Sequence, residues 1–164
     1  MDPIETAIYQ QDMDLPSEAA TISIARRLAA VARAGDVIAL NGDLGAGKTS
    51  FARSFIAAMT GQAEEAPSPT FTLVQTYDSE RGTIWHFDLY RLERADDALE
   101  LGLEDALAEG ITLIEWPARI AGLLPRERLD VTLSFQLDRD SARHLHLAGR
   151  GGWATRLQSV IGHG

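Results

Sequence analysis

One stretch of the sequence has residue types and spacing suited to phosphate chemistry. Residues 42–49 read Gly-Asp-Leu-Gly-Ala-Gly-Lys-Thr and match the P-loop pattern G-x-x-x-x-G-K-[ST] at every fixed position. In such a loop, glycines let backbone N–H groups surround a polyphosphate, the lysine reaches its outer phosphates, and the hydroxyl binds Mg²⁺. The residues expected to bind the ligand are Gly42, Asp43, Gly45, Ala46, Gly47, Lys48, Thr49 and Ser50.

The segments on either side of this loop are the elements that must position it. Residues 36–41 form a short apolar run that predicts a buried strand, and residues 50–59 carry Phe51, Phe55 and Met59 at helical spacing. A P-loop requires a strand, a glycine loop and a helix in this order, because the helix adds the positive end of its dipole to the cradle. The alternative is a glycine-rich turn that binds nothing, and the two flanking elements argue against it.

Two carboxylates follow other expected strands. Asp88 comes directly after a strand expected at residues 83–87, and Glu115 ends a mostly apolar strand expected at residues 111–115. Ligands bind at the carboxyl edge of such strands in open α/β sheets, so these side chains are candidates to hold Mg²⁺ or to orient a water. A helix cap is the alternative for Asp88. We interpret Trp116 as a core residue, with shielding of a nucleotide as its alternative.

Other periodic segments complete the expected organisation. Ser17 is a plausible N-cap for a helix that ends near Ala32. Further strands are expected at residues 5–11, 72–77, 129–137 and 143–148, and residues 78–82 predict a hairpin turn. We expect a single domain at residues 1–150, followed by a loose glycine-rich tail at residues 151–164.

Composition excludes several classes of function. The sequence has 164 residues and no cysteine, which rules out disulfides, thiolate zinc sites and cysteine nucleophiles. The net charge of −9 argues against a large nucleic-acid footprint. With neither a signal-peptide pattern nor a run of 18 apolar residues, we expect a cytoplasmic protein with no membrane contact.

The acidic residues gather in one segment. Residues 93–109 contain seven acidic side chains and Arg94 as the single basic one. Such a run usually forms the solvated face of a helix, which is our interpretation. A docking surface for a basic partner is the alternative.

Four sequence blocks together resemble the TsaE (formerly YjeE) family, ATPases of bacterial tRNA threonylcarbamoyladenosine biosynthesis. The blocks are residues 42–49, residues 68–71 (Ser-Pro-Thr-Phe), residues 86–91 (His-Phe-Asp-Leu-Tyr-Arg) and residues 114–117 (Ile-Glu-Trp-Pro). The resemblance extends from about Ser17 to Asp130. It implies an α/β, P-loop NTPase-like three-layer fold with a mixed parallel/antiparallel sheet.

The same resemblance implies a ligand set and partners. These are ATP with Mg²⁺, and the proteins TsaB and TsaD, with tRNA involved only indirectly. Mg²⁺ maps onto Thr49 and Glu115, and Asp88 is the residue implied to serve hydrolysis or a metal-bound water, so the expected catalytic residues are Asp88, Glu115 and Lys48. Thr70, in the second block, is expected near the γ-phosphate as in nucleotide switches; its alternative is the proline-stiffened start of a strand.

Three other functions share the P-loop. A small-molecule kinase needs a second pocket and usually a lid with arginines, for which Arg91 and Arg94 are candidates, although 164 residues leave little room for a lid. A GTPase is disfavoured because the sequence has no Asn-Lys-x-Asp run. A non-hydrolysing scaffold would bind ATP only to hold its partners together.

Overall fold

The computed structural model describes residues 7–61, 73–136 and 139–161. Its strands are β1 (Ile8–Leu15), β2 (Val37–Asn41), β3 (Val74–Ser79), β4 (Gly82–Asp88), β5 (Ile111–Glu115), β6 (Leu129–Gln136) and β7 (Arg139–Arg150). Its helices are α1 (Glu18–Ala30), α2 (Lys48–Thr60), α3 (Asp97–Glu100), α4 (Leu103–Glu109) and α5 (Gly152–Ile161), with a 3-10 helix η1 (Pro117–Leu123).

One seven-stranded sheet forms the middle layer, in the order β1-β7-β6-β2-β5-β4-β3. The central strand β2 runs parallel to both β5 and β6, and β4 runs parallel to β5. The pairs β1 with β7, β6 with β7 and β3 with β4 are antiparallel. The sheet is therefore mixed, as expected from the sequence, and β2, β4 and β5 deliver their carboxyl ends to one edge.

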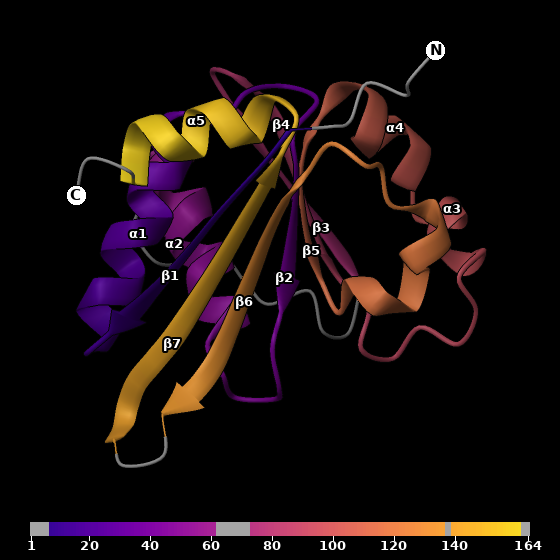
Figure 1. The fold of residues 1–164 in the computed structure, drawn as a ribbon. Coiled ribbons are helices and arrows are strands. Elements are labelled where there is room, and N and C mark those ends of the chain that lie inside the picture. Colours follow the sequence, from indigo (N-terminus) through magenta and orange to yellow (C-terminus); the bar gives the residue numbers. More distant parts are fainter. Residues whose placement is uncertain (1–6, 62–72, 137–138, 162–164) are drawn as a thin grey trace.

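Helices cover both faces of this sheet (Figure 1). On one face α1, α2 and α5 enclose the larger core, which includes Leu28, Phe51 and Phe55. On the other face α3, α4 and η1 enclose a second core, which includes Phe87 and Ile114. The predicted three-layer α/β fold is confirmed.

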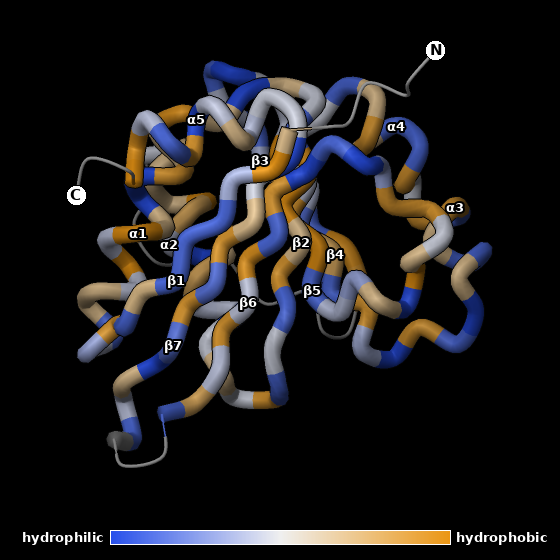
Figure 2. The backbone as a smooth tube through the Cα atoms, in the orientation of Figure 1, coloured by the Kyte–Doolittle hydropathy of each residue, from blue (hydrophilic) through white to orange (hydrophobic). Residues whose placement is uncertain are grey.

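The central strands are apolar because both of their faces are covered. Every residue of β5 is buried, as are the first four residues of β2, and Figure 2 shows these strands as the hydrophobic middle of the molecule. Such continuous apolar runs are typical of parallel strands between two helical layers. This burial fixes the P-loop at one end of β2 and Glu115 at the end of β5.

The local signals of the first helix and the hairpin are confirmed. The Ser17 hydroxyl accepts a hydrogen bond from the backbone N–H of Ala20 and caps α1. The strands β3 and β4 form the expected hairpin, with a turn between Ser79 and Gly82. The first strand lies later than predicted, because its pairing with β7 runs to Leu15.

The expectation of a loose tail was wrong for the residues that the structure describes there. Residues 152–161 form α5, whose buried side chains include Trp153, Leu157 and Ile161, spaced four residues apart on one face. The glycines that suggested a flexible segment have a structural role instead. Gly151 has a φ of 66°, and a Cβ at Gly149 would lie 2.7 Å from the carbonyl oxygen of Trp153.

The acidic segment forms two short helices rather than one. Its buried members are apolar, such as Leu103 and Ala106 in α4, and most of its carboxylates are exposed. This arrangement fits the interpretation as a solvated helical face. No helix in the described ranges is long and apolar enough to cross a membrane.

Candidate functional site

The P-loop segment, residues 42–49, leads from β2 into α2 at the carboxyl edge of the sheet. Three of its glycines have positive φ angles, 145° at Gly42, 80° at Gly45 and 109° at Gly47, a conformation that other residues disfavour. An added Cβ at Gly42 would also lie only 2.5 Å from the carbonyl oxygen of Leu133 in β6. Glycine is therefore required here both by the backbone conformation and by the close approach of a neighbouring strand.

Lys48 is held inside the loop by its own backbone. The ammonium donates hydrogen bonds to the carbonyl oxygens of Gly42 and Asp43, the latter at 3.0 Å. It also lies 4.0 Å from the centre of the Trp116 ring, a cation–π contact. Burial lowers the pKa of Lys48 below its usual 10.5, and the surrounding carboxylates, Glu115 first, oppose that shift.

Glu115 links the sheet to the first turn of α2. One carboxylate oxygen, Oε1, accepts a hydrogen bond of 2.8 Å from the Thr49 hydroxyl. The other, Oε2, lies 2.7 Å from Nε2 of His86 in β4. The residue is only 2 % exposed, so both contacts form away from water. The predicted pair of Thr49 and Glu115 is thus brought together across 66 residues of sequence.

Asp88 lies beside Glu115 at the same edge. The two residues are register partners in the parallel β4–β5 pair. One Asp88 oxygen accepts a hydrogen bond of 3.1 Å from the backbone N–H of Tyr90, so the carboxylate also stabilises the turn after β4. Asp88 therefore bonds a turn and lines the site, and it is not a helix cap, because the next described helix, α3, begins only at Asp97.

These side chains meet at a cavity of about 280 Å³ on the sheet edge. Trp116 lines it while packing against the second core, so it is not a core residue alone. The centres of the Trp116 and Tyr90 rings lie 4.9 Å apart. The backbone φ of Trp116 is 60°, which is rare for a residue other than glycine. The residues lining the cavity are Leu44, Gly45, Gly47, Lys48, Thr49, Ser50, Asp88, Tyr90, Glu115 and Trp116.

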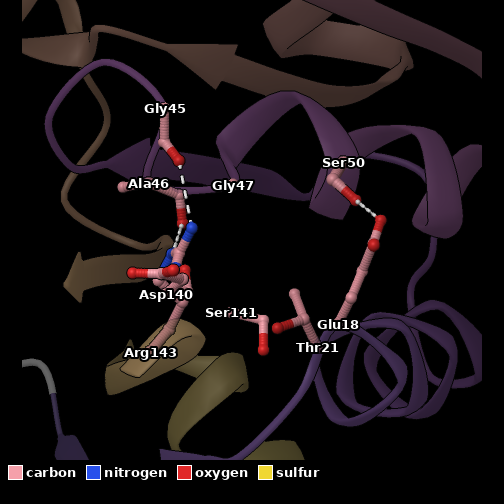
Figure 3. Close-up of a pocket in the computed structure, with 9 residues that line it drawn as sticks. All are labelled: Glu18, Thr21, Gly45, Ala46, Gly47, Ser50, Asp140, Ser141 and Arg143. Atoms are coloured by element: carbon pink, nitrogen blue, oxygen red, sulfur yellow. Dashed lines mark hydrogen bonds between the residues drawn. The ribbon is translucent and has the colours of Figure 1, made fainter. Parts of the chain in front are cut away.

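A second cavity of about 330 Å³ lies on the other side of the P-loop segment (Figure 3). It shares Gly45, Gly47 and Ser50 with the first cavity and extends toward the start of α1 and toward β7. Its remaining lining residues are Glu18, Thr21, Ala46, Asp140, Ser141 and Arg143.

Arg143 braces the P-loop segment from β7. Its guanidinium donates to the carbonyl oxygens of Ala46 at 3.0 Å and Gly45 at 3.3 Å, as Figure 3 shows. Sequence reasoning expected Arg143 only as the first residue of a strand. Its contact depends on where the paired strands β6 and β7 place residue 143 relative to the P-loop segment, which the pattern within one strand does not predict.

The remaining predicted residues divide into two groups. Ala46 and Ser50 line the second cavity, whereas Asp43 is not among the described residues that line either cavity. Thr70 lies outside the described residues. Arg91 is exposed in the turn after β4 and is not among the described residues that line the first cavity.

The fold and the site together define an α/β protein of the P-loop NTPase-like type. The chain belongs to the TsaE family: the model of the family described as threonylcarbamoyl adenosine biosynthesis protein TsaE matches residues 15–145.

Individual relatives agree with this assignment. The chain is 45 % identical over 126 residues to the tRNA threonylcarbamoyladenosine biosynthesis protein TsaE of Rickettsia bellii, which covers 77 % of this chain and 87 % of that protein. It is 40 % identical over 114 residues to the protein of the same name from Bacillus subtilis, covering 69 % and 70 %. A crystal structure of Bacillus subtilis YdiB is similar with a TM-score of 0.77 at 29 % identity, covering 96 % of this chain and 97 % of that one.

The role of Arg143 predicts a local change in dynamics. Arg143→Ala removes a charged hydrogen-bond donor from two P-loop carbonyls. The free energy of local opening of residues 44–47 should therefore fall by about 1–3 kcal/mol, which faster amide hydrogen exchange would report. Arg128→Ala is the matched control, because Arg128 bonds Asp130 and a carbonyl at the opposite end of β6. Unchanged exchange of the loop in Arg143→Ala would contradict the bracing role.

Proposed function

We propose that this protein is an ATPase that binds and hydrolyses ATP with Mg²⁺ in support of the TsaB–TsaD machinery, which forms threonylcarbamoyladenosine in tRNA. The observation that carries the proposal is a single cavity that joins the P-loop lysine to the Thr49–Glu115 pair and to Asp88. Membership of the TsaE family, and the names of its relatives, support the role in tRNA modification.

The P-loop segment supplies the cradle for the phosphates. Gly45 and Gly47 have positive φ angles, which allow backbone N–H groups to face one anion, and the first turn of α2 would add its dipole. Lys48 would exchange its two carbonyl partners and the Trp116 ring for phosphate oxygens. Because burial disfavours the lone ammonium, a dianionic partner would return its pKa toward the ordinary value.

Thr49 and Glu115 fit the donor set of a magnesium site. A hydroxyl and a carboxylate 2.8 Å apart are hard oxygen ligands of the kind that Mg²⁺ prefers. In the described part of the chain no three acidic or histidine side chains gather into a complete metal site, so phosphate oxygens and waters would fill the other positions. When bound, the ion would neutralise charge on the phosphates.

Asp88 is the residue that we propose to orient the attacking water. It lines the same cavity, is 7 % exposed, and keeps its orientation through the Tyr90 backbone N–H. A carboxylate so fixed can accept a hydrogen bond from a water on the open side of the phosphates. Glu115 is the weaker candidate for this task, because its hydrogen bond to Thr49 suits the proposed magnesium site.

The second cavity offers space for the nucleoside. It adjoins the first one at Gly45 and Gly47, which is where the polyphosphate chain would turn away from the catalytic side. Thr21 and Ser141 bring hydroxyl groups to its wall. A ribose and base lying there would explain why this hollow is continuous with the P-loop segment.

Docking to partners is proposed to complete the active site. Lys48 is the single cation among the described residues lining the first cavity, and residues 62–72 contain no lysine or arginine in their sequence. Phosphoryl transfer is often accelerated by an arginine supplied from another protein. TsaB and TsaD are the proposed partners, with the acidic helices α3 and α4 as a docking surface, and tRNA involved only indirectly. The cytoplasm is the proposed location.

One prediction of the proposed function concerns the role of the partners. Phosphate release from ATP should be slow for the isolated chain and faster with TsaB and TsaD present, because a charge supplied in trans stabilises the transition state. A malachite green assay at several salt concentrations measures it. Equal rates with and without TsaB and TsaD would contradict stimulation by the partners. A phosphorylated acceptor molecule would instead indicate a kinase, and ATP left unchanged would indicate a non-hydrolysing scaffold.

Another prediction of the proposed function separates the roles of the two carboxylates. Asp88→Ala should slow phosphate release about 10²-fold to 10⁴-fold while ATP affinity stays near that of the parent, as expected for loss of a water-orienting group. Glu115→Ala should instead weaken ATP binding only when Mg²⁺ is present. Rapid-quench turnover and calorimetry distinguish these effects, and Asp78→Ala, an exposed acid in β3, is the control. The reverse pattern would exchange the two roles.

A further inference from the structure

His86 is a buried polar residue to which neither the sequence nor the proposed function assigned a task. It lies in β4 with 0 % of its surface exposed. Its Nε2 atom lies 2.7 Å from Oε2 of Glu115. Its other ring nitrogen, Nδ1, has no hydrogen-bond partner among the residues that the structure describes. The contact with Glu115 is thus the one polar interaction that the ring makes in this part of the chain.

The pairing of β4 with β5 explains how the two side chains meet. His86 pairs with Leu113, and Asp88 pairs with Glu115. Side chains two residues apart lie on the same face of a strand, so His86 and Glu115 are diagonal neighbours on the face that meets α2. The alternate residues Phe87 and Ile114 belong to the core on the opposite face.

The two oxygens of the Glu115 carboxylate have different partners on opposite sides. Oε1 points to the Thr49 hydroxyl at the cavity, and Oε2 points to His86 in the interior. An imidazole facing a carboxylate donates from the ring nitrogen that carries the hydrogen, and here that nitrogen is Nε2. The interior donor therefore fixes the rotation of the carboxylate and presents Oε1 to the cavity.

We propose that His86 is a positioning residue for Glu115, holding the carboxylate so that Oε1 and the Thr49 hydroxyl form one preorganised pair of Mg²⁺ ligands. The inference rests on the proposed function, because it concerns the ligands of the proposed metal. Groups that orient a metal ligand through its second atom commonly contribute about tenfold to hundredfold in metal affinity. Removing the donor would also leave a buried carboxylate oxygen without a partner, which favours another rotamer of Glu115.

Four variants separate positioning from simple filling of the core. His86→Leu keeps an apolar side chain of similar size but removes the donor. In His86→Gln the side-chain amide nitrogen can reach the place of Nε2, whereas in His86→Asn the shorter side chain cannot. Thr112→Val is the matched control, because it removes another buried hydrogen bond, from the Thr112 hydroxyl in β5 to the Ala106 carbonyl in α4.

The measurement is the Mg²⁺ concentration that gives half-maximal binding of a non-hydrolysable ATP analogue, by calorimetry, with binding in EDTA as the reference. We expect His86→Leu and His86→Asn to raise this concentration about tenfold to hundredfold. His86→Gln should stay close to the parent, as should Thr112→Val, and binding in EDTA should be the same for all.

Two results would overturn the inference. One is a parental Mg²⁺ requirement in His86→Leu or His86→Asn, and the other is an equal increase in His86→Gln and His86→Asn. Because His86→Gln and His86→Asn both retain a polar side chain, comparing these two variants tests the inference even if His86→Leu does not fold. A parent protein that binds no ATP analogue in either buffer would instead refute the proposed function, together with the inference that rests on it.

Discussion

A carboxylate withdrawn from water must be hydrogen-bonded or paired, and Glu115 is the residue where this constraint organises the molecule. Its two oxygens bond Thr49 in α2 and His86 in β4, while its backbone continues β5. Three elements are therefore joined through one side chain that is 2 % exposed. The parallel pairing of Leu40 with Glu115 places Glu115 beside the P-loop segment, because that segment starts two residues after Leu40.

Lys48 is the buried positive charge beside Glu115 at the same cavity. It is 5 % exposed, and backbone carbonyls together with the Trp116 ring replace the water it has lost. These partners are neutral, so they leave the ammonium with less stabilisation than a phosphate dianion would give. Binding of a polyphosphate, as proposed, would therefore replace these internal contacts of Lys48 with phosphate contacts, and the binding affinity would include the cost of breaking them.

Local sequence patterns predicted what local geometry decides. The P-loop glycines, the Ser17 cap, the β3–β4 hairpin and the position of Glu115 at a strand end all depend on short-range rules of backbone conformation and burial. Arg143 and His86 could not be assigned roles in this way, because their contacts depend on which strands pair and in which register. The helix α5 was missed for a different reason, since glycines that permit close packing were interpreted as signs of a loose segment.

The most direct test of the central claim, that Lys48 lies at a phosphate site, uses the fact that it is the single lysine in the sequence. Protein labelled with ¹³C-lysine gives one ε-methylene NMR signal, which can be titrated with pH in the absence and presence of ATP and Mg²⁺. Without ATP the signal should titrate below the usual lysine pKa of 10.5. Saturating ATP should raise that pKa and remove the ring-current shift caused by Trp116. A signal with the same chemical shift and the same titration in both states would contradict the account.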